Sequence, residues 1–152
     1  MYIALFSIII IIIDQLSKHF IRVYLSQSQK ISIIGDYFYL TFVKNRGAAF
    51  GILEGQRSFF ILTTIFFLVF IIYLYKKELP KIFVAKIALI FLLGGSIANL
   101  IDRIIFHYVT DFIAFDIIKF YQLPVINIAD IFIFFGVLIL IYQLLFLADR
   151  GA

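Results

Sequence analysis

The chain has 152 residues, of which 64% are hydrophobic and only 14% are charged, and its mean hydropathy is +1.13. A soluble domain is about half apolar and about a quarter charged, so this composition excludes a soluble globular protein. The net charge of +4 is modest and scattered, without the basic stripe and interleaved aromatic residues of a nucleic-acid-binding surface. Cysteine is absent, which excludes disulfides, thiolate metal sites, a cysteine nucleophile and lipidation of the chain on cysteine.

Four long apolar runs predict four membrane-spanning helices. They cover about residues 3–25, 59–75, 83–105 and 129–147, and each is near the roughly 17–25 residues that a helix needs to cross the bilayer core. The first run has no basic segment before it and no small-residue cleavage site after it, so we expect a retained span and not a cleaved signal peptide. The predicted fold is a single membrane-embedded domain over residues 1–152, built as a four-helix bundle.

The first run carries an acidic and a basic residue four positions apart, Asp14 and Lys18. This spacing places them on one helix face, where an ion pair would make both charges tolerable in the membrane. A direct part in a functional site is the second interpretation. Ser17 beside Lys18 suggests a Ser/Lys hydrolase, but neighbouring helix positions point about 100° apart, so these two side chains cannot act on each other.

The polar segment at about residues 26–58 predicts a small β-sheet. Residues 32–34 and 37–43 are rich in β-branched and aromatic residues, and a Gly-Asp turn separates them. Their aromatic rings suit the membrane interface. Residues 45–51 follow, and they are either a turn leading to the second run or a surface for an extended substrate, to which Asn45 would offer its amide.

The second run contains Thr63 and Thr64 as its only polar residues, which predicts a lipid-facing scaffold. The short loop after it is rich in lysine at residues 76–81. By the positive-inside rule this loop is cytoplasmic, although the earlier polar segment also carries cations. Both termini are then cytoplasmic, and the outer ends of the third and fourth runs lie near the extracytoplasmic face.

Three aspartates gather at those outer ends, where ionisable groups are costly and are therefore leading functional candidates. Asn99, Asp102 and Arg103 share one face of the third helix. Gly94 and Ala98 form a small-residue pair on the same helix that allows close approach by another helix. We expect residues 104–124 to form a loop carrying Asp111.

Pro124 is expected to introduce the fourth helix, because its missing N–H does no harm in a first helical turn. Asn127 and Asp130 repeat the three-residue spacing at the outer end of that helix. We therefore expect the polar residues of the third helix, the loop and the fourth helix to meet on one side of the bilayer.

Two neighbouring carboxylates in a poorly hydrated site share one proton, so their apparent pKa values separate. The ionised one can take a proton from water while the protonated one polarises a carbonyl, which is the chemistry of an aspartic peptidase. Asp102 adjoins Arg103, and such a carboxylate favours an ionised structural role. Asp111 and Asp130 are therefore the predicted catalytic pair, with Asp102 as the rival.

Other functions remain open on the residues alone. A magnesium site built from the aspartates is one, although the two histidines, His19 and His107, do not make a metal centre; we predict no metal and no cofactor. A small proton- or ion-coupled transporter is the main alternative, since intramembrane aspartates also mark proton relays. A non-catalytic assembly factor, binding other helices through its small residues, is the third.

Five motifs along almost the whole chain together resemble those of the lipoprotein signal peptidases, the signal peptidase II family of bacterial inner membranes. In order they are Asp14-Gln-Leu-Ser-Lys18, Asn45-x-Gly47-Ala48-Ala49-Phe50-Gly51, Gly94-Gly95-x-x-Ala98-Asn99-x-x-Asp102-Arg103, Asp111-Phe112-Ile113 and Asn127-x-Ala129-Asp130. The resemblance implies a four-helix membrane aspartic endopeptidase with an extracytoplasmic sheet. It would cut diacylglyceryl-modified prolipoproteins just before the lipidated cysteine, and the cyclic peptide globomycin would inhibit it. Membrane lipid is the other expected partner, nucleic acid is not one, and we expect a monomer.

Carried onto this chain, the resemblance makes Asp111 and Asp130 catalytic. It implies that six further residues bind substrate or support the pair: Asn45, Gly51, Asn99, Arg103, Asn127 and Ala129. Asp14, Lys18 and Asp102 would support the architecture.

The chain departs from the family pattern at three positions. Ala98 stands where glycine is common, Thr110 where valine is usual, and Ile131 where serine often follows the second aspartate. None of these changes removes a carboxylate. We therefore expect effects on turnover and not on the class of reaction.

Overall fold

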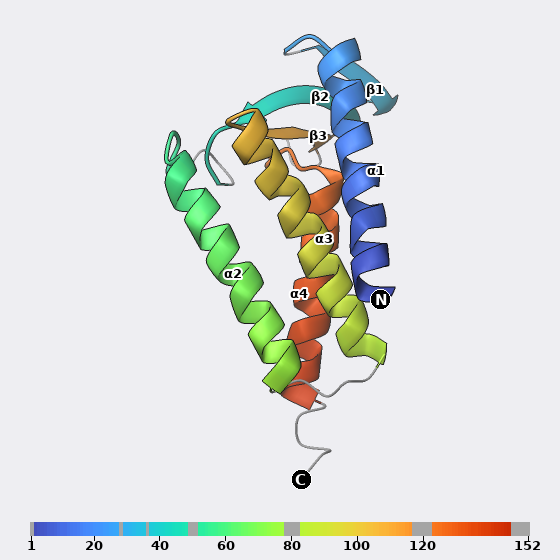
Figure 1. Cartoon of the computed structure of the whole chain (residues 1–152). Helices are drawn as coiled ribbons and strands as arrows, with labels where there is room; N and C mark the ends of the chain where they lie inside the picture. The colour runs from blue at the N-terminus through green and yellow to red at the C-terminus, as the bar shows by residue number, and fades with distance from the viewer. Residues whose placement is uncertain are drawn as a thin grey trace.

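The computed structural model describes residues 2–27, 29–35, 37–48, 52–77, 83–116 and 123–146. Along these residues four helices and three strands follow one another, as Figure 1 shows. They are α1 (Tyr2–Tyr24), β1 (Lys30–Ile34), β2 (Phe38–Asn45), α2 (Arg57–Lys77), α3 (Phe83–Ile105), β3 (Val109–Phe115) and α4 (Ile128–Phe146). All four helices are long and apolar enough to cross a membrane. The membrane four-helix fold predicted from the apolar runs is confirmed.

Helix α3 is the centre of the bundle, and the other three helices pack against it. Small residues allow two of these approaches, as expected for helices that associate in a membrane. A Cβ atom at Gly94 would meet Ile10 of α1 at 2.9 Å, and one at Gly95 would meet the carbonyl oxygen of Ala129 in α4 at 2.6 Å. The two adjacent glycines therefore seat two different helices against α3.

The three strands form one antiparallel sheet in the order β1-β2-β3. The β1–β2 hairpin was predicted, and Gly35 in its turn has a φ of +50°, which glycine adopts without a steric penalty. The loop predicted over residues 104–124 was wrong in part, because it contains the third strand, β3. Val43 of β2 pairs with Asp111 of β3, so this aspartate lies on a strand.

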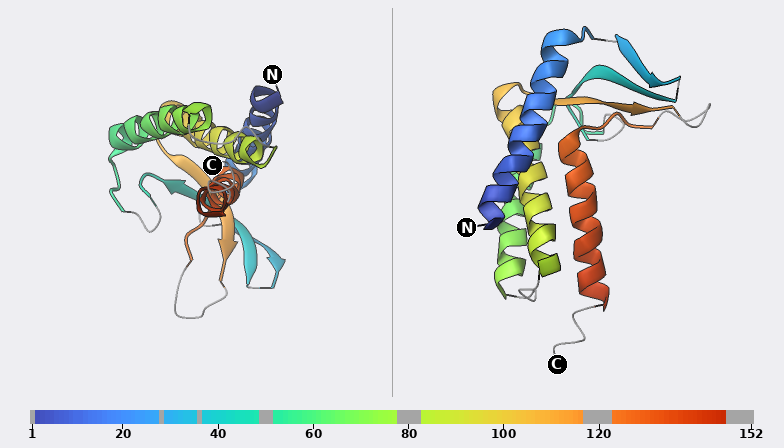
Figure 2. Two further views of the ribbon diagram at one scale, coloured as in Figure 1. Left: turned by 90° about the horizontal axis from the view of Figure 1, so that it is seen from below. Right: turned by 90° about the vertical axis from the view of Figure 1, so that its right-hand side faces the viewer.

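The sheet covers one end of the bundle and projects past the helices, as the right-hand view in Figure 2 shows. A buried cluster of Ile21, Leu25, Phe42 and Phe112 joins the end of α1 to β2 and β3. Because alternate residues of a strand point to opposite faces, Phe112 lies against α1 while Asp111 points to the other face. The sheet is thereby fixed to α1 with one side of β3 free to line a site.

The expected role of Pro124 was wrong. Helix α4 begins at Ile128, four residues later, and Asn127 is its N-cap, because its side-chain oxygen accepts a hydrogen bond from the backbone N–H of Asp130 at 2.9 Å. The residues before the cap are held by β3, since Ile126 pairs with Ile113. A side-chain cap and a short strand contact therefore start the helix.

Candidate active site

Asp111 and Asp130 come from different elements and face one cavity of about 200 Å³. Asp111 lies in the middle of β3, and Asp130 lies in the first turn of α4. The cavity is also lined by residues of β2, α3 and the segment before α4: Asn45, Gly47, Ala48, Asn99, Arg103, Val109, Pro124, Val125 and Ile126. The two aspartates predicted to act together are thus brought to the same space.

Each of the four carboxylate oxygens of this pair accepts a hydrogen bond from an asparagine. Asn45 Nδ2 donates to Asp111 Oδ2 and Asn127 Nδ2 to Asp111 Oδ1, both at 2.7 Å. Asn99 Nδ2 donates to Asp130 Oδ1 at 2.8 Å, and the backbone N–H of Asn127 donates to Asp130 Oδ2 at 3.1 Å. Neutral amide donors therefore orient both carboxyl groups, and among the described residues no cation forms a direct ion pair with either.

Asn127 is the residue that joins the two aspartates. It is fully buried, and its amide nitrogen also donates to Asn99 Oδ1 at 3.2 Å. Its side chain accepts from the N–H of Asp130 while the Asp130 side chain accepts from the N–H of Asn127, which is a reciprocal capping box. The position of Asp130 is therefore set by the same bonds that begin α4.

The pKa of Asp111 is raised to about 7, first by burial and second by the negative charge of Asp130. The hydrogen bonds from Asn45 and Asn127 act in the opposite direction, since they favour the ionised form. Asp111 is only 2% exposed, so burial is the larger effect. At neutral pH Asp111 keeps a proton for much of the time, as a proton-sharing pair requires.

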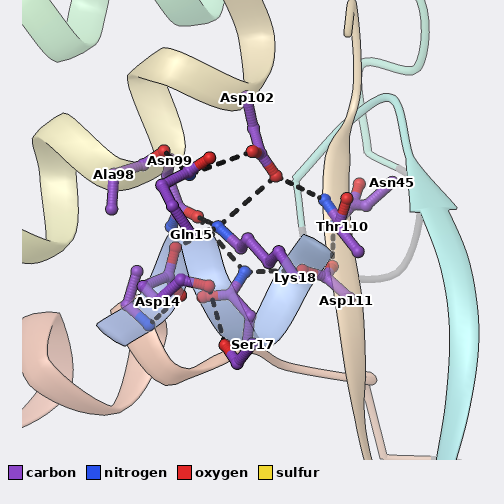
Figure 3. A network of polar contacts seen from close by, with 12 residues as sticks. Asp14, Gln15, Ser17, Lys18, Asn45, Ala98, Asn99, Asp102, Thr110 and Asp111 are labelled. Carbon is purple, nitrogen blue, oxygen red and sulfur yellow. Dashed lines mark hydrogen bonds and ion pairs between the residues drawn. The ribbon is translucent and has the colours of Figure 1, made fainter. Parts of the chain in front are cut away.

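The expected ion pair on α1 is confirmed. Lys18 Nζ lies 2.8 Å from Asp14 Oδ2, and both side chains are fully buried. Lys18 also donates to Asn99 Oδ1 at 2.7 Å and lies 3.4 Å from Asp102 Oδ2, as Figure 3 shows. Because the Asn99 oxygen is engaged by Lys18, its amide nitrogen is turned toward Asp130.

Asp102 pairs with two cations of α1, Lys18 and Arg22. The prediction that it would pair with its neighbour Arg103 was wrong. Its carboxylate oxygens lie 3.4 Å from Lys18 Nζ and 3.5 Å from Arg22 Nη1, and they accept bonds from Gln15 Nε2 at 3.0 Å and from the backbone N–H of Thr110 at 2.9 Å. Adjacent helix positions point about 100° apart, which separates the two side chains.

Arg103 faces away from that cluster. Its guanidinium lies over the ring of Phe60 at 5.2 Å, and Arg103 lines the cavity of the two aspartates. Arg57 binds the end of the same helix, donating from Nε to the Arg103 carbonyl at 2.8 Å and from Nη2 to that of Ile104 at 2.9 Å. Positive charge at a helix C-terminus is favourable, so α2 secures the turn that presents Arg103.

The backbone of Ala129 connects three helices at the site. Its N–H donates to Asp14 Oδ1 at 2.8 Å, and its carbonyl lies against Gly95. Its side chain is fully buried, so the contacts of Ala129 support the position of Asp130. Gly51, also predicted for the site, lies outside the described residues.

A second cavity of about 370 Å³ adjoins the first between α2, α3 and α4. The two share Asn99, Arg103 and Asp130. Helix α2 is largely exposed, as expected of a lipid-facing scaffold, and its Thr63 and Thr64 also line the second cavity. Two adjacent hydroxyl residues in an otherwise apolar run were the available signal for this cavity.

Sequence reasoning also missed Arg22 and Thr110 as parts of the polar network around the aspartates. Arg22 Nη1 donates to Thr110 Oγ1 at 2.9 Å. The signal for Arg22 was its position four residues after Lys18, which continues the charged face of α1. In the part of the chain that the structure describes, no three carboxylate or imidazole side chains converge to hold a metal ion.

The family model described as signal peptidase (SPase) II matches residues 6–146. The chain belongs to the signal peptidase II family. Proteins named lipoprotein signal peptidase are similar to it: that of Moorella thermoacetica is 40% identical, covering 93% of this chain and 91% of the relative. That of Halothermothrix orenii is 42% identical, covering 90% of each, and that of Brevibacillus brevis is 41% identical, covering 93% of each.

Two solved structures, each described as a bacterial membrane enzyme studied by the in meso method, share the fold. The one at 2.3 Å resolution has a TM-score of 0.89 and 31% identity, covering 99% of this chain and 92% of the other. The one at 1.9 Å has a TM-score of 0.85 and 32% identity, covering 95% and 93%. This signal peptidase II family member is therefore a membrane aspartic peptidase, and no finding supports the transporter alternative.

Proposed function

We propose that Asp111 and Asp130 are the catalytic pair of an endopeptidase that removes the signal peptide from diacylglyceryl-modified prolipoproteins, cutting just before the lipidated cysteine. The observation that carries this proposal is the placement of both carboxyl groups on one cavity, with a donor on each oxygen. The names of the relatives, lipoprotein signal peptidases, support the substrate class.

In the proposed reaction, protonated Asp111 donates a hydrogen bond to the oxygen of the scissile carbonyl. Ionised Asp130 takes a proton from a water molecule, whose oxygen attacks the carbonyl carbon to give a tetrahedral intermediate. As the intermediate forms, Asp111 transfers its proton to the former carbonyl oxygen. Asp130 then delivers the proton it took from water to the leaving nitrogen as the C–N bond breaks, and a hydroxyl group of the intermediate returns a proton to Asp111 as the new carboxyl group forms. This assignment is supported by the raised pKa of Asp111 and by its deeper burial, since Asp130 is only half-buried.

The second cavity is the proposed path by which the signal peptide reaches the pair from the membrane. It lies between helices and combines apolar Phe67, Ile133 and Val137 with hydroxyl groups. An apolar peptide helix and its attached lipid would stay in a hydrocarbon-like environment along this path, while the scissile bond meets the polar cavity. Globomycin would compete for the same space.

We further propose that both termini are cytoplasmic and that the sheet and the catalytic cavity lie near the extracytoplasmic face of the bacterial inner membrane. The basic residues Lys76 and Lys77 end α2 at the opposite end of the bundle from the sheet (Figure 1). Such residues favour the cytoplasmic side. A single chain contains both aspartates, which supports a monomer as the working unit.

The test is cleavage of a diacylglyceryl-modified prolipoprotein, followed as a mobility shift on a gel. Wild type cuts and globomycin stops it; Asp111→Asn and Asp130→Asn are inactive, whereas folded Asp102→Asn retains residual cleavage. Normal cleavage by Asp111→Asn with a folded but inactive Asp102→Asn would transfer the pair to Asp102 and Asp130. If wild type leaves the substrate intact, the proposed reaction is wrong.

A further inference from the structure

Thr110, the residue before Asp111, is bound from two helices at once. It is fully buried. Its side-chain oxygen accepts from Arg22 Nη1 of α1 at 2.9 Å, and its backbone N–H donates to Asp102 Oδ2 of α3 at 2.9 Å. Since Thr110 and Asp111 point to opposite faces of β3, the bonds of Thr110 fix the strand without entering the cavity.

The edge of β3 is held on both sides of Asp111. The N–H of Thr110 bonds to Asp102, and the N–H of Phe112 bonds to the carbonyl oxygen of Ile126 at 2.9 Å. On the other edge, β2 pairs with Asp111 itself through Val43. The backbone of this aspartate therefore has a fixed position before any asparagine orients its carboxyl group.

Contacts other than that with Thr110 also hold the side chain of Arg22 in place. Its guanidinium carbon lies 4.1 Å from the centroid of the Phe106 ring, Nη1 is 3.5 Å from Asp102 Oδ1, and the side chain is 13% exposed. A cation packed on a ring face and beside a carboxylate loses little further freedom when it donates to a hydroxyl. Arg22 is thus a rigid support for the first residues of β3.

We propose that Arg22 and Thr110 are positioning residues for Asp111, acting as one unit that holds β3 at the distance from α4 that the reaction needs. The proposal rests on the catalytic role proposed for Asp111. Thr110 stands where the family pattern led us to expect valine. A valine here would leave the partly buried Arg22 without its hydroxyl acceptor, so a change toward the family's usual residue should be harmful in this chain.

The experiment compares Thr110→Val, Thr110→Ser, Arg22→Met and the double variant Arg22→Met/Thr110→Val in the purified full chain. We expect Thr110→Val to lower kcat about tenfold with little change in KM, because small displacements of a catalytic group are costly. Thr110→Ser, which keeps the hydroxyl, restores turnover. The double variant is expected to be no slower than Arg22→Met alone, since each single change breaks the same hydrogen bond between Arg22 and Thr110.

Thr41→Val is the matched control, because Thr41 is also buried in the sheet but lines a different cavity from that of the two aspartates; we expect its kcat to stay near that of wild type. Deuterium uptake over Val109–Phe115 gives a readout without substrate, and it rises in Thr110→Val and Arg22→Met but not in Thr110→Ser. Unchanged kcat and unchanged uptake in Thr110→Val overturn the positioning role, as does a fully additive double variant. If wild type cleaves nothing, the proposed function fails and the uptake decides the positioning role alone.

Discussion

The carboxylate of Asp14, in the middle of α1, accepts a hydrogen bond at 2.8 Å from the backbone N–H of Ala129, the residue before Asp130. The same carboxylate pairs with Lys18 through its other oxygen. Asp14 therefore connects the one buried lysine of α1 to the first turn of the helix that carries a proposed catalytic residue.

Asp14→Asn should destabilise the fold by less than the roughly 3–5 kcal/mol of a fully broken buried ion pair, because Lys18 loses its nearer carboxylate and keeps Asp102 at 3.4 Å. The asparagine oxygen can still accept the hydrogen bond from the N–H of Ala129. The loss of stability therefore measures the ion pair between Asp14 and Lys18. Thermal unfolding in detergent micelles measures it. Asp14→Asn/Lys18→Met, with neither charge, should unfold at a higher temperature than Asp14→Asn; equal melting of Asp14→Asn and wild type would contradict the prediction.

The raised pKa of Asp111 makes stability depend on pH. Its native pKa of about 7 lies above the ordinary value of 3.8, so the native state holds the proton more tightly than the unfolded state. The resulting stabilisation is complete below about pH 4 and is lost as the pH rises through about 7.

As the pH rises from about 4 to about 7, the melting temperature of wild type should therefore fall relative to that of Asp111→Asn, which cannot ionise. Glu54→Gln, which removes an exposed carboxylate, serves as the control. Parallel melting curves of wild type and Asp111→Asn at all pH values would show that Asp111 does not titrate in this range.

Asn127→Ser should separate helix capping from support of the proposed catalytic pair. Serine still caps α4 by accepting from the N–H of Asp130, but its single, shorter hydroxyl does not replace the amide that donates to both Asp111 and Asn99. A hydrogen bond to an ionisable group contributes about 1.5–3 kcal/mol, so kcat should fall about tenfold or more while the protein stays folded. Steady-state kinetics and circular dichroism check this, and a kcat close to wild type would rule out the donor role of Asn127.

Gly95→Ala should lower both stability and turnover. Its new methyl group would press on the carbonyl oxygen of Ala129, only 2.6 Å from the Cβ position, and so shift the start of α4. Gly136→Ala is the control on the same pair of helices, because its Cβ would meet Leu92 Cγ at 2.8 Å, farther along α4 from Asp130. Both should destabilise by about 1–3 kcal/mol, but only Gly95→Ala should reduce kcat; equal kinetic losses would refute this distinction.

The helices were predictable to within a few residues because apolar length alone decides whether a segment can span a bilayer. The β1–β2 hairpin was predictable because its strands are neighbours in the sequence. Strand β3 was not, since its partner β2 lies far away in the chain and an acidic residue interrupts its apolar pattern. Asn45 and Asp111, which are 66 positions apart, show the separation that a local pattern cannot bridge.

The same limit applies to the site. The ion pair of Asp14 and Lys18 has a helical spacing and was found from it, whereas the contact of Lys18 with Asn99 spans 81 positions. Adjacency suggested Arg103 as the partner of Asp102, but packing of α1 against α3 supplied Lys18 and Arg22. The gathering of the aspartates was predictable, because the ends of the third and fourth runs were expected on one side of the membrane. Their hydrogen-bond partners could be identified only from the packing of the helices and strands.

The charged face of α1 also has a consequence for how the protein is made. Asp14 and Lys18 can pair as soon as α1 forms, because they lie one turn apart. Arg22 finds Asp102 and Thr110 only 80 and 88 positions later. Until α3 has been synthesised, we therefore expect the positive charge of Arg22 to lack its partners. Packing of α3 against α1 then removes the electrostatic cost of that charge near the bilayer.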